Sequence, residues 1–270
     1  MEELVLIDKK PVEEGFPLRA LFFGEGVFET FRCRGGLPVF IDRHISRLKR
    51  GAEALHIPYP GDGVVEEYIT HALGQSGLRD AYFKLCLLSR GRGTFSLLPE
   101  GCSLAAVVRP YSDSGDSYRV KVSAIRRHST SPLCGIKSLN YLDSIIARRE
   151  ARADGCDEAV FLNEKGFVAE GTASNVFWIS GDELLTPSVE CGLLPGVMRS
   201  VVLEVGREIG MEVREGEFGV EQALRAEAVF LTNSSIAMAS VREFEGWEFD
   251  AHHSAFAALR DAVLKKLGWV

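Results

Sequence analysis

One interior segment of the sequence has the composition of a linker. Residues 111–117 read YSDSGDS, and a cluster of serine, glycine and aspartate favours turns over a packed core. This segment divides the 270 residues into two parts, each long enough to bury a hydrophobic core of its own. We therefore predict an N-terminal α/β domain at residues 1–112, a linker at 113–117 and a C-terminal domain at 118–270.

Both parts mix strand patterns with helix patterns. In the first part, aromatic and β-branched residues after a Gly-Glu-Gly turn predict a strand at Gly26–Cys33, and Ala81–Leu88 is a second strand-like run. Asp42 is a candidate N-cap for the helix that follows it. In the second part, residues 140–153 predict a helix that Gly155 ends. The residues of this helix that recur at helical spacing are Leu142, Ile145, Ile146 and Arg149. Because the elements lack a regular βαβ rhythm, we predict an α+β fold of two mixed α/β domains.

Charge and cysteine usage narrow the range of partners. The chain carries 31 Lys and Arg against 38 Asp and Glu, and this net charge of −7 argues against a broad surface for nucleic acid or an anionic membrane. A small anionic ligand is still compatible with it, because a few local donors can outweigh the global field. The six cysteines form no C-x-x-C pair, and no apolar run approaches the ~20 residues that span a bilayer. With no signal-peptide pattern after Met1, we expect a cytoplasmic protein without a membrane or nucleic-acid partner.

Several catalytic motifs are absent from the sequence. It contains neither G-x-G-x-x-G after a strand nor the P-loop pattern, which disfavours a nucleotide-binding domain of either kind. H-E-x-x-H and G-x-S-x-G are also absent, so we expect neither a catalytic metal nor a serine-hydrolase site.

Four short segments carry residues of catalytic or binding types. Lys137 lies among apolar residues in IKSLNYL, where burial would lower its pKa and suit it to Schiff-base chemistry, although a solvated lysine is the simpler interpretation of this segment alone. Glu170, in VAEGTASNVF, is either an ordinary turn carboxylate or a partner for a heterocyclic nitrogen. LPGVMR, at residues 194–199, begins a helix whose free N–H groups favour a phosphate. RHISRL, at residues 43–48, offers an arginine to the same anion.

Together these segments resemble the class IV, or fold type IV, pyridoxal-phosphate enzymes. The motifs that carry the resemblance run in order from about Phe23 to Arg242: FGEGVFETFR, the H-x-x-R-L of residues 44–48, IKSLNYL, DEAVFLNEKGFVAEGTASNVF and LPGVMR. The lysine and EG-x-x-SN motifs, about thirty residues apart, are a highly specific combination. The resemblance implies a D-amino-acid-aminotransferase-like fold with pyridoxal 5′-phosphate at the junction of the two domains. It also implies a homodimer in which a loop of one subunit reaches the pocket of the other.

The resemblance assigns roles to individual residues. Lys137 is implied to form the Schiff base with pyridoxal 5′-phosphate and to carry the proton, and Glu170 is implied to pair with the pyridine nitrogen. Met198 stands where the family often has threonine, which leaves only a backbone donor at that position. The residues implied to bind the cofactor are Arg47, Tyr141, Glu170, Val197, Met198, Asn233 and Ser234.

The family includes branched-chain aminotransferases, D-amino-acid aminotransferases and 4-amino-4-deoxychorismate lyases. The Tyr-x-Arg of branched-chain enzymes is Tyr82-Phe83-Lys84 here, and the loop SRGRGTFS at residues 89–96 lacks the histidine of D-amino-acid enzymes. Both features, together with LTNS at residues 231–234, look more like the lyases. We therefore expect a lyase of folate biosynthesis that releases pyruvate and 4-aminobenzoate. A transaminase of branched-chain L-amino acids or D-amino acids and a non-catalytic pyridoxal-phosphate-binding protein are the alternatives. The residues expected to contact the substrate are Phe28, Lys84, Arg90 and Arg92.

Overall fold

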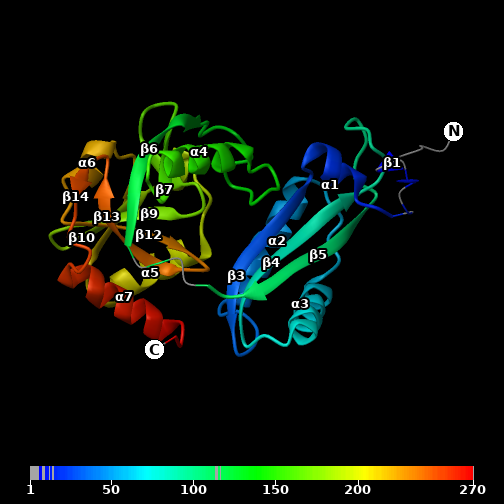
Figure 1. Cartoon of the computed structure of the whole chain (residues 1–270), viewed down its shortest axis with the longest axis horizontal. Helices are drawn as coiled ribbons and strands as arrows, with labels where there is room; N and C mark the ends of the chain where they lie inside the picture. Colours follow the sequence, from blue (N-terminus) through cyan, green and yellow to red (C-terminus); the bar gives the residue numbers. More distant parts are fainter. Residues whose placement is uncertain are drawn as a thin grey trace. The chain divides into compact units, whose positions relative to one another are not determined.

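The chain folds into two units, each with its own sheet and core (Figure 1). This computed structural model describes residues 6–7, 10–11, 13, 15–112, 115 and 117–269. Unit 1 consists of Met1–Tyr111 and Ile136–Asn140, and unit 2 consists of Ser112–Gly135 and Tyr141–Val270. The chain therefore returns to unit 1 once after leaving it. Residues 113, 114 and 116 of the expected linker lie outside the described residues, and the domain bounds 1–112 and 118–270 stay a prediction.

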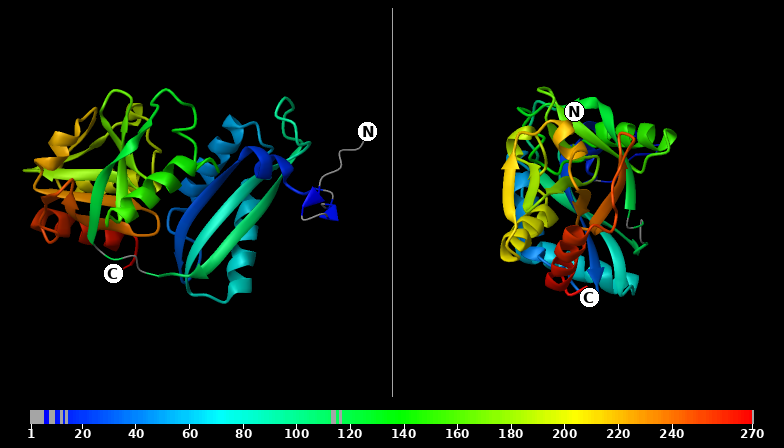
Figure 2. Two further views of the ribbon diagram at one scale, coloured as in Figure 1. Left: turned by 45° about the horizontal axis from the view of Figure 1, so that its top comes forward. Right: turned by 90° about the vertical axis from the view of Figure 1, so that its left-hand side faces the viewer.

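Unit 1 is built on an antiparallel sheet in the order β3-β4-β5. Residues of β4 are alternately buried and half-buried, so one face of the sheet is apolar. Helices α2 and α3 cover that face, as Figures 1 and 2 show, and their residues share a core with the strands. The bounds are α1 Leu18–Phe23, β3 Gly26–Arg34, α2 Ile41–Ala54, α3 Asp62–Ser76, β4 Asp80–Arg90 and β5 Gly101–Pro110; a small hairpin precedes them, β1 Leu6–Ile7 with β2 Lys10–Pro11.

The start of α2 differs from the sequence prediction. The N-cap is Phe40, whose φ is 61°, and the helix begins at Ile41. The expectation that Asp42 is the N-cap is therefore wrong by two positions. Asp42 lies in the first turn of the helix, where its negative charge interacts favourably with the positive end of the helix dipole.

Unit 2 contains a larger mixed sheet. In its described residues the strands follow the order β11-β10-β9-β12-β13-β6-β7-β8, with β14 paired to β13. Strand β6 runs parallel to both of its neighbours, β7 and β13. The bounds are β6 Ser117–Arg127, β7 Glu158–Asn163, β8 Val168–Gly171, β9 Asn175–Ser180, β10 Glu183–Pro187, β11 Glu212–Gly216, β12 Ala228–Asn233, β13 Ala237–Phe244 and β14 Trp247–Glu248.

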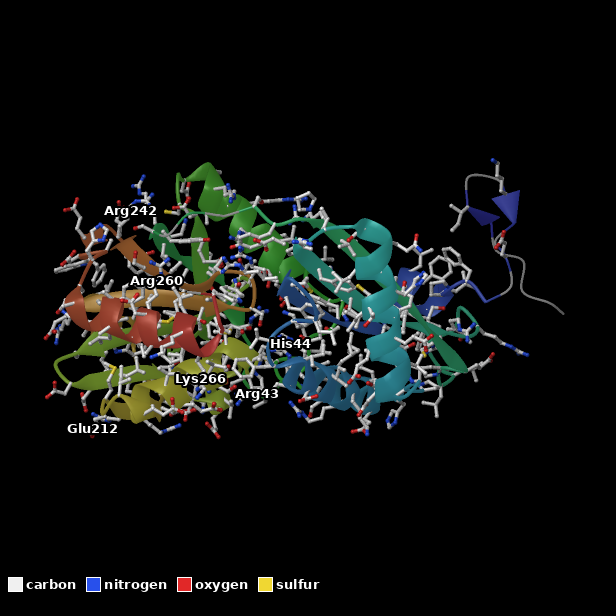
Figure 3. The ribbon with its side chains drawn as sticks, turned by 90° about the horizontal axis from the view of Figure 1, so that it is seen from below. Arg43, His44, Glu212, Arg242, Arg260 and Lys266 are labelled. Atoms are coloured by element: carbon white, nitrogen blue, oxygen red, sulfur yellow. The ribbon has the colours of Figure 1, made fainter. Side chains whose placement is uncertain are left out.

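The helices of unit 2 pack on this sheet. Helix α5 lies against α7 and β12, and the ammonium group of Lys266 near the end of α7 donates to Glu208 Oε1 of α5 at 2.6 Å (Figure 3 labels Lys266). Within the described part of the chain, none of the helices combines the length and the apolar character needed to cross a membrane. The bounds are α4 Leu142–Ala153, α5 Val197–Glu208, α6 Val220–Leu224 and α7 Ser254–Lys266, with a 3-10 turn at Val189–Cys191.

Helix α4 forms where the sequence predicted it but presents an apolar face outward. The helix ends at Ala153 with Asp154 as its C-cap, and the next residue, Gly155, has a φ of 76°, the left-handed conformation that favours glycine at this place. Small residues make up its buried face, namely Ser144, Ala147 and Ala151. Its large apolar residues are exposed in this chain, with Leu142 at 72%, Ile145 at 41% and Ile146 at 44%.

Candidate functional site

Lys137 is held against the start of β3. The backbone N–H of Phe28 donates to the Lys137 carbonyl at 2.8 Å, and Ser138 forms an isolated bridge with Val27. The backbone N–H of Leu139 donates to the Gly26 carbonyl at 2.9 Å. These bonds fix the backbone on both sides of Lys137. Its half-buried side chain lies with Nζ 4.6 Å from the centroid of the Phe28 ring.

Lys84 approaches the same ring. Its Nζ lies 4.4 Å from the Phe28 centroid, so two ammonium groups share one aromatic ring. Each gains a cation–π attraction, and their mutual repulsion favours an anion nearby. The structure therefore brings together three residues that the sequence assigned to catalysis and substrate binding: Phe28, Lys84 and Lys137.

The two loop arginines lie elsewhere in unit 1. Arg90 stands six residues beyond Lys84 on β4, a separation of roughly 20 Å at about 3.3 Å per residue. Its Nε is buried and has no hydrogen-bond partner among the described residues. Arg92 is exposed on the loop that follows. In the same chain, Arg90 and Arg92 therefore do not contact the same small substrate as Lys84.

Arg47 belongs to a buried cluster of charged residues. Its Nε donates to Glu29 Oε1 at 2.8 Å and its Nη2 donates to Glu29 Oε2 at 2.6 Å. His44 Nδ1 lies 2.7 Å from Glu29 Oε2. Burial would raise the pKa of Glu29, but the Arg47 charge and the hydrogen bonds from Arg47 and His44 outweigh it and lower that pKa to about 2. Burial lowers the pKa of His44, although its hydrogen bond to Glu29 acts the other way.

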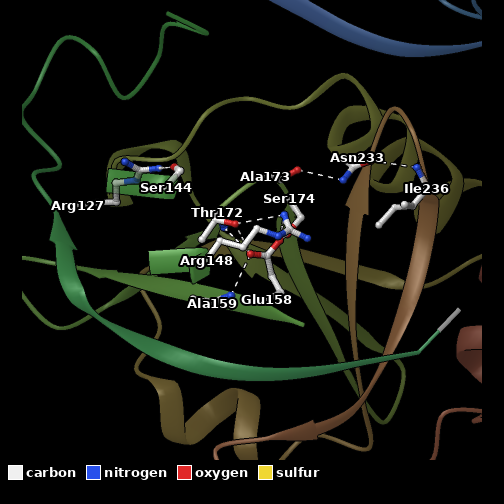
Figure 4. Close-up of polar contacts among 10 residues, drawn as sticks. All are labelled: Arg127, Ser144, Arg148, Glu158, Ala159, Thr172, Ala173, Ser174, Asn233 and Ile236. Atoms are coloured by element: carbon white, nitrogen blue, oxygen red, sulfur yellow. Dashed lines mark hydrogen bonds and ion pairs between the residues drawn. The ribbon is translucent and has the colours of Figure 1, made fainter. Parts of the chain in front are cut away.

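Glu170 of unit 2 is fixed by a backbone donor and an arginine. The N–H of Leu194 donates to Glu170 Oε2 at 3.0 Å, and Arg127 Nη2 lies 3.3 Å from Glu170 Oε1. Arg127 is itself held, because its Nη2 donates to Ser144 Oγ at 3.0 Å (Figure 4) and its guanidinium stacks on Phe161 at 4.1 Å. The carboxylate of Glu170 therefore has a set orientation before any ligand binds.

The turn after Glu170 is held by a second buried carboxylate, that of Glu158. Its Oε1 accepts from the backbone N–H of Ala159 at 3.0 Å and of Thr172 at 3.1 Å, and also from the Thr172 hydroxyl. Its Oε2 lies 3.3 Å from Arg148 Nη1 and 3.4 Å from Ser174 Oγ (Figure 4). Glu158 is only 2% exposed, so this set of donors fixes the turn that leads from β8 to β9.

Asn233 ties this turn to the end of β12. Its Nδ2 donates to the Ala173 carbonyl at 3.0 Å, and its Oδ1 accepts from the Ile236 N–H at 3.0 Å (Figure 4). The same Oδ1 accepts from the Ser235 N–H at 2.9 Å. Three of its hydrogen-bonding positions thus serve the backbone. Ser234 lies within the same turn and is half-buried.

The N-terminus of α5 offers backbone N–H donors of the kind that bind anions. Gly196 is its N-cap and provides no side-chain hydrogen bond, so the N–H groups of Val197 and Met198 in the first turn lack intrahelical acceptors. A Cβ on Gly196 would lie 2.1 Å from Asn175 Oδ1, and Asn175 Nδ2 donates to the Leu194 carbonyl at 3.0 Å. The approach to this helix is therefore packed too closely for any residue but glycine. Tyr141, the N-cap of α4, is half-buried.

Comparison with known proteins identifies the family. The amino-transferase class IV model matches residues 26–244. The chain belongs to the class IV aminotransferase family. The earlier resemblance is thereby confirmed, and the protein is an enzyme of a pyridoxal-phosphate-dependent family.

Named relatives of this class IV enzyme include both lyases and aminotransferases. The aminodeoxychorismate lyase of Bacillus subtilis is 30% identical over 268 residues, covering 95% of this chain and 88% of the relative. A "putative branched-chain-amino-acid aminotransferase" of Methanocaldococcus jannaschii is 33% identical over 248 residues, covering 89% and 85%. The crystal structure of a "putative 4-amino-4-deoxychorismate lyase" of Legionella pneumophila superposes with a TM-score of 0.88 at 31% identity, covering 96% of this chain and 97% of that chain. The predicted fold is confirmed.

The residues present fit the cofactor of the class IV family. The free N–H groups of α5 suit a phosphate, and the fixed carboxylate of Glu170 suits a protonated ring nitrogen. Three charged residues that support the candidate site residues were missed by the sequence analysis. Glu29, which pairs with Arg47, and Glu158 are buried, and Arg127, which pairs with Glu170, is half-buried. Their signal was a charged residue inside an apolar strand pattern, as in VFETF and DEAVF, because such a residue is buried only with a partner.

Proposed function

We propose that the chain is a pyridoxal-phosphate-dependent 4-amino-4-deoxychorismate lyase that releases pyruvate and 4-aminobenzoate. The observation that carries this proposal is the pair of ammonium groups, those of Lys84 and Lys137, at the Phe28 ring. In this proposal the Lys137 amine would hold the cofactor and the Lys84 amine would bind a substrate carboxylate. The near full-length similarity to aminodeoxychorismate lyase supports the same choice.

Each unit contributes its own residues to cofactor binding in this proposal. Pyridoxal phosphate, when bound, supplies a ring that takes up the electron pair released from the substrate. Lys137 Nζ would hold the cofactor and move the proton. Glu170 would pair with the ring nitrogen and keep it protonated. The phosphate would be held by Arg47, by the first N–H groups of α5 and by Ser234, and Tyr141 and Asn233 would also contact the cofactor.

A transaminase is the second candidate. The similarity to the Methanocaldococcus jannaschii protein favours it, because that relative is named a branched-chain-amino-acid aminotransferase. The two candidates share the roles of Lys137 and Glu170. They differ in their products: a transaminase would release a keto acid, whereas the lyase would release pyruvate and 4-aminobenzoate.

We further propose that the enzyme is a homodimer located in the cytoplasm. The exposed apolar face of α4, formed by Leu142, Ile145 and Ile146, supports a dimer in which a second copy of the chain packs on this face. Because Arg90 lies far from Lys84 in the same chain, we propose that the loop after β4 contacts the substrate bound by the partner subunit. All six cysteines are free thiols, which agrees with a reducing compartment.

Product analysis tests the reaction. Purified protein supplied with pyridoxal phosphate is given 4-amino-4-deoxychorismate, and release of 4-aminobenzoate is compared with amino transfer from D-alanine and from branched-chain amino acids. We expect 4-aminobenzoate release to dominate. Robust amino transfer without any 4-aminobenzoate would establish the transaminase instead.

Two lysine variants separate cofactor binding from substrate binding. Lys137→Ala should abolish the borohydride-sensitive visible absorption of the protein with pyridoxal phosphate. Lys84→Met is the matched control, since it removes the other amine at the Phe28 ring; it should keep the absorption and raise KM. An unchanged absorption band in Lys137→Ala would reject the assignment of the lysine.

A further inference from the structure

Arg19 is a buried charged residue outside the candidate site. It lies on α1 and is only 2% exposed. Its guanidinium donates to Glu25 from Nε at 2.5 Å and from Nη2 at 3.0 Å. Its Nη1 donates to the backbone carbonyls of Thr94 at 2.6 Å and Arg92 at 3.3 Å. One side chain therefore joins a carboxylate to the backbone of a loop some seventy residues away in sequence.

Glu25, the carboxylate that Arg19 binds, is itself held in place by Ser89. Ser89 Oγ donates to Glu25 Oε2 at 2.5 Å, the Ser89 N–H donates to the Glu25 carbonyl at 3.1 Å, and Ser89 is fully buried at the end of β4. Burial raises the pKa of Glu25, but the hydrogen bonds from Arg19 and Ser89 more than offset it, so the pKa lies below its ordinary value. The carboxylate is thus ionised and immobile at neutral pH.

The loop held by Arg19 runs from Gly91 to Glu100. The backbone N–H of Glu100 donates to the Arg90 carbonyl at 2.9 Å and closes its base. Gly91 has a φ of 129°, and a Cβ there would lie 3.3 Å from Arg19 Cδ, so the arginine side chain also fills the space beneath the loop. The tip is open to solvent, with Phe95 84% exposed.

We propose that Arg19 is a positioning residue for the loop at residues 91–100 and thereby for substrate recognition by Arg92. A guanidinium can bind a carboxylate with one edge and carbonyls with another, which a lysine ammonium on a single flexible stem cannot reproduce. Loss of the Arg92 and Thr94 contacts removes the two hydrogen bonds by which Arg19 holds the middle of the loop. This inference rests on the proposed function, in which the loop contacts the substrate.

The test uses Arg19→Lys in the full-length enzyme with pyridoxal phosphate bound. Limited chymotrypsin digestion measures the rate of cleavage after Phe95, identified by mass spectrometry. We expect cleavage at least ten-fold faster than in the parent protein. KM for 4-amino-4-deoxychorismate should rise at least five-fold, with kcat within two-fold and with unchanged cofactor retention.

Arg199→Lys is the matched control for the digestion. Arg199 is also a buried arginine that binds a carboxylate and a carbonyl, those of Glu215 and Pro187, but it lies in unit 2. Its replacement should leave cleavage after Phe95 unchanged. If Arg19→Lys does not fold, Ser89→Ala provides a milder variant, which removes one hydrogen bond to Glu25 and should speed cleavage by a smaller factor.

The outcomes separate this inference from the proposed function. Unchanged cleavage in both Arg19→Lys and Ser89→Ala overturns the positioning role, whatever the enzyme catalyses. Faster cleavage with an unchanged KM also overturns it, because a mobile loop would then have no effect on substrate binding. If the parent protein releases no 4-aminobenzoate, the lyase proposal fails, and KM is measured with the amino donor that the parent converts.

Discussion

Arg47 and Glu29 form a buried ion pair with two hydrogen bonds, from Nε to Oε1 at 2.8 Å and from Nη2 to Oε2 at 2.6 Å. Glu29 is 1% exposed and Arg47 is 7% exposed. The arginine that the family resemblance assigns to the cofactor phosphate is thus also the partner of a carboxylate in the core of unit 1. Removing it changes two things, and these can be measured separately.

We predict that Arg47→Met lowers the free energy of unfolding by about 3–5 kcal/mol, because it leaves the Glu29 charge buried without its partner. The double variant Glu29→Gln/Arg47→Met should recover at least about 1 kcal/mol of this loss, since the introduced amide carries no charge and can still accept from His44. Urea denaturation of the cofactor-free protein measures both. Strict additivity of the two single changes would contradict a buried ion pair.

Cofactor retention should follow a different pattern in the same variants. The single and the double variant both lack the Arg47 guanidinium, so both should bind pyridoxal phosphate at least ten-fold more weakly than the parent. Equilibrium dialysis of folded protein gives the dissociation constants. Equal affinity in variant and parent would remove Arg47 from the phosphate site and leave it a purely structural role.

Acid should destabilise the protein partly through Glu29. Its pKa is lowered to about 2 in the folded protein from an ordinary value of 4.5, so its stabilising effect is complete above pH 4.5 and is lost as pH falls from 4.5 to 2. At about 1.4 kcal/mol per pKa unit, the loss amounts to at most about 3.5 kcal/mol. We predict that Glu29→Gln is less stable at pH 6 and loses less stability over this window. Parallel curves for parent and variant would argue against the lowered pKa.

The sequence predicted the elements whose patterning is strong. The strand-like run Ala81–Leu88 was predicted correctly, and the structure extends it to Asp80–Arg90 with alternate residues buried. Helix α3 was missed: it begins after Gly61 without a side-chain cap, and its fully buried apolar residues are few, chiefly Val65 and Ile69. Its position is set by packing against the sheet rather than by a local signal.

The candidate site was predictable only as far as its motifs. Lys137 and Glu170 stand out by family spacing, but nothing local in the sequence pairs Glu29 of β3 with Arg47 of α2, because that contact arises when the helix packs on the sheet. The same holds for Glu158, whose donors come from α4 and from the turn after β8. Supporting residues of this kind depend on tertiary structure.

Glu158 should be more important for stability than Arg148, its partly exposed ion-pair partner. In Glu158→Gln an NH₂ group replaces one carboxylate oxygen and faces hydrogen-bond donors that it cannot accept from. We therefore predict a loss of about 3 kcal/mol in the free energy of unfolding and weaker retention of pyridoxal phosphate. Arg148→Met is the matched control: its contact with Glu158 is long, at 3.3 Å, and its side chain is 32% exposed. It should cost less than about 1 kcal/mol. Equal effects of the two changes would contradict a dominant role for the backbone donors.

The close contact between Gly196 and Asn175 predicts a steric effect on the cofactor. Gly196 has φ −69° and ψ 142°, which alanine adopts without strain, but a Cβ would lie 2.1 Å from Asn175 Oδ1. Gly196→Ala should therefore displace the first turn of α5 and weaken pyridoxal phosphate binding at least ten-fold. Gly74→Ala is the control, because nothing lies within 4 Å of its Cβ position in α3, and it should leave binding unchanged and raise stability by about 0.5–1 kcal/mol.

A second change distinguishes a steric clash from a general loss of the glycine. Asn175→Ala removes the side-chain oxygen that the new Cβ would meet, at the cost of the hydrogen bond to the Leu194 carbonyl. If the clash is the cause, Gly196→Ala/Asn175→Ala binds pyridoxal phosphate more tightly than Gly196→Ala alone. If the double variant is instead weaker than either single variant, the two residues act independently, and the open N-terminus of α5 does not depend on their close approach.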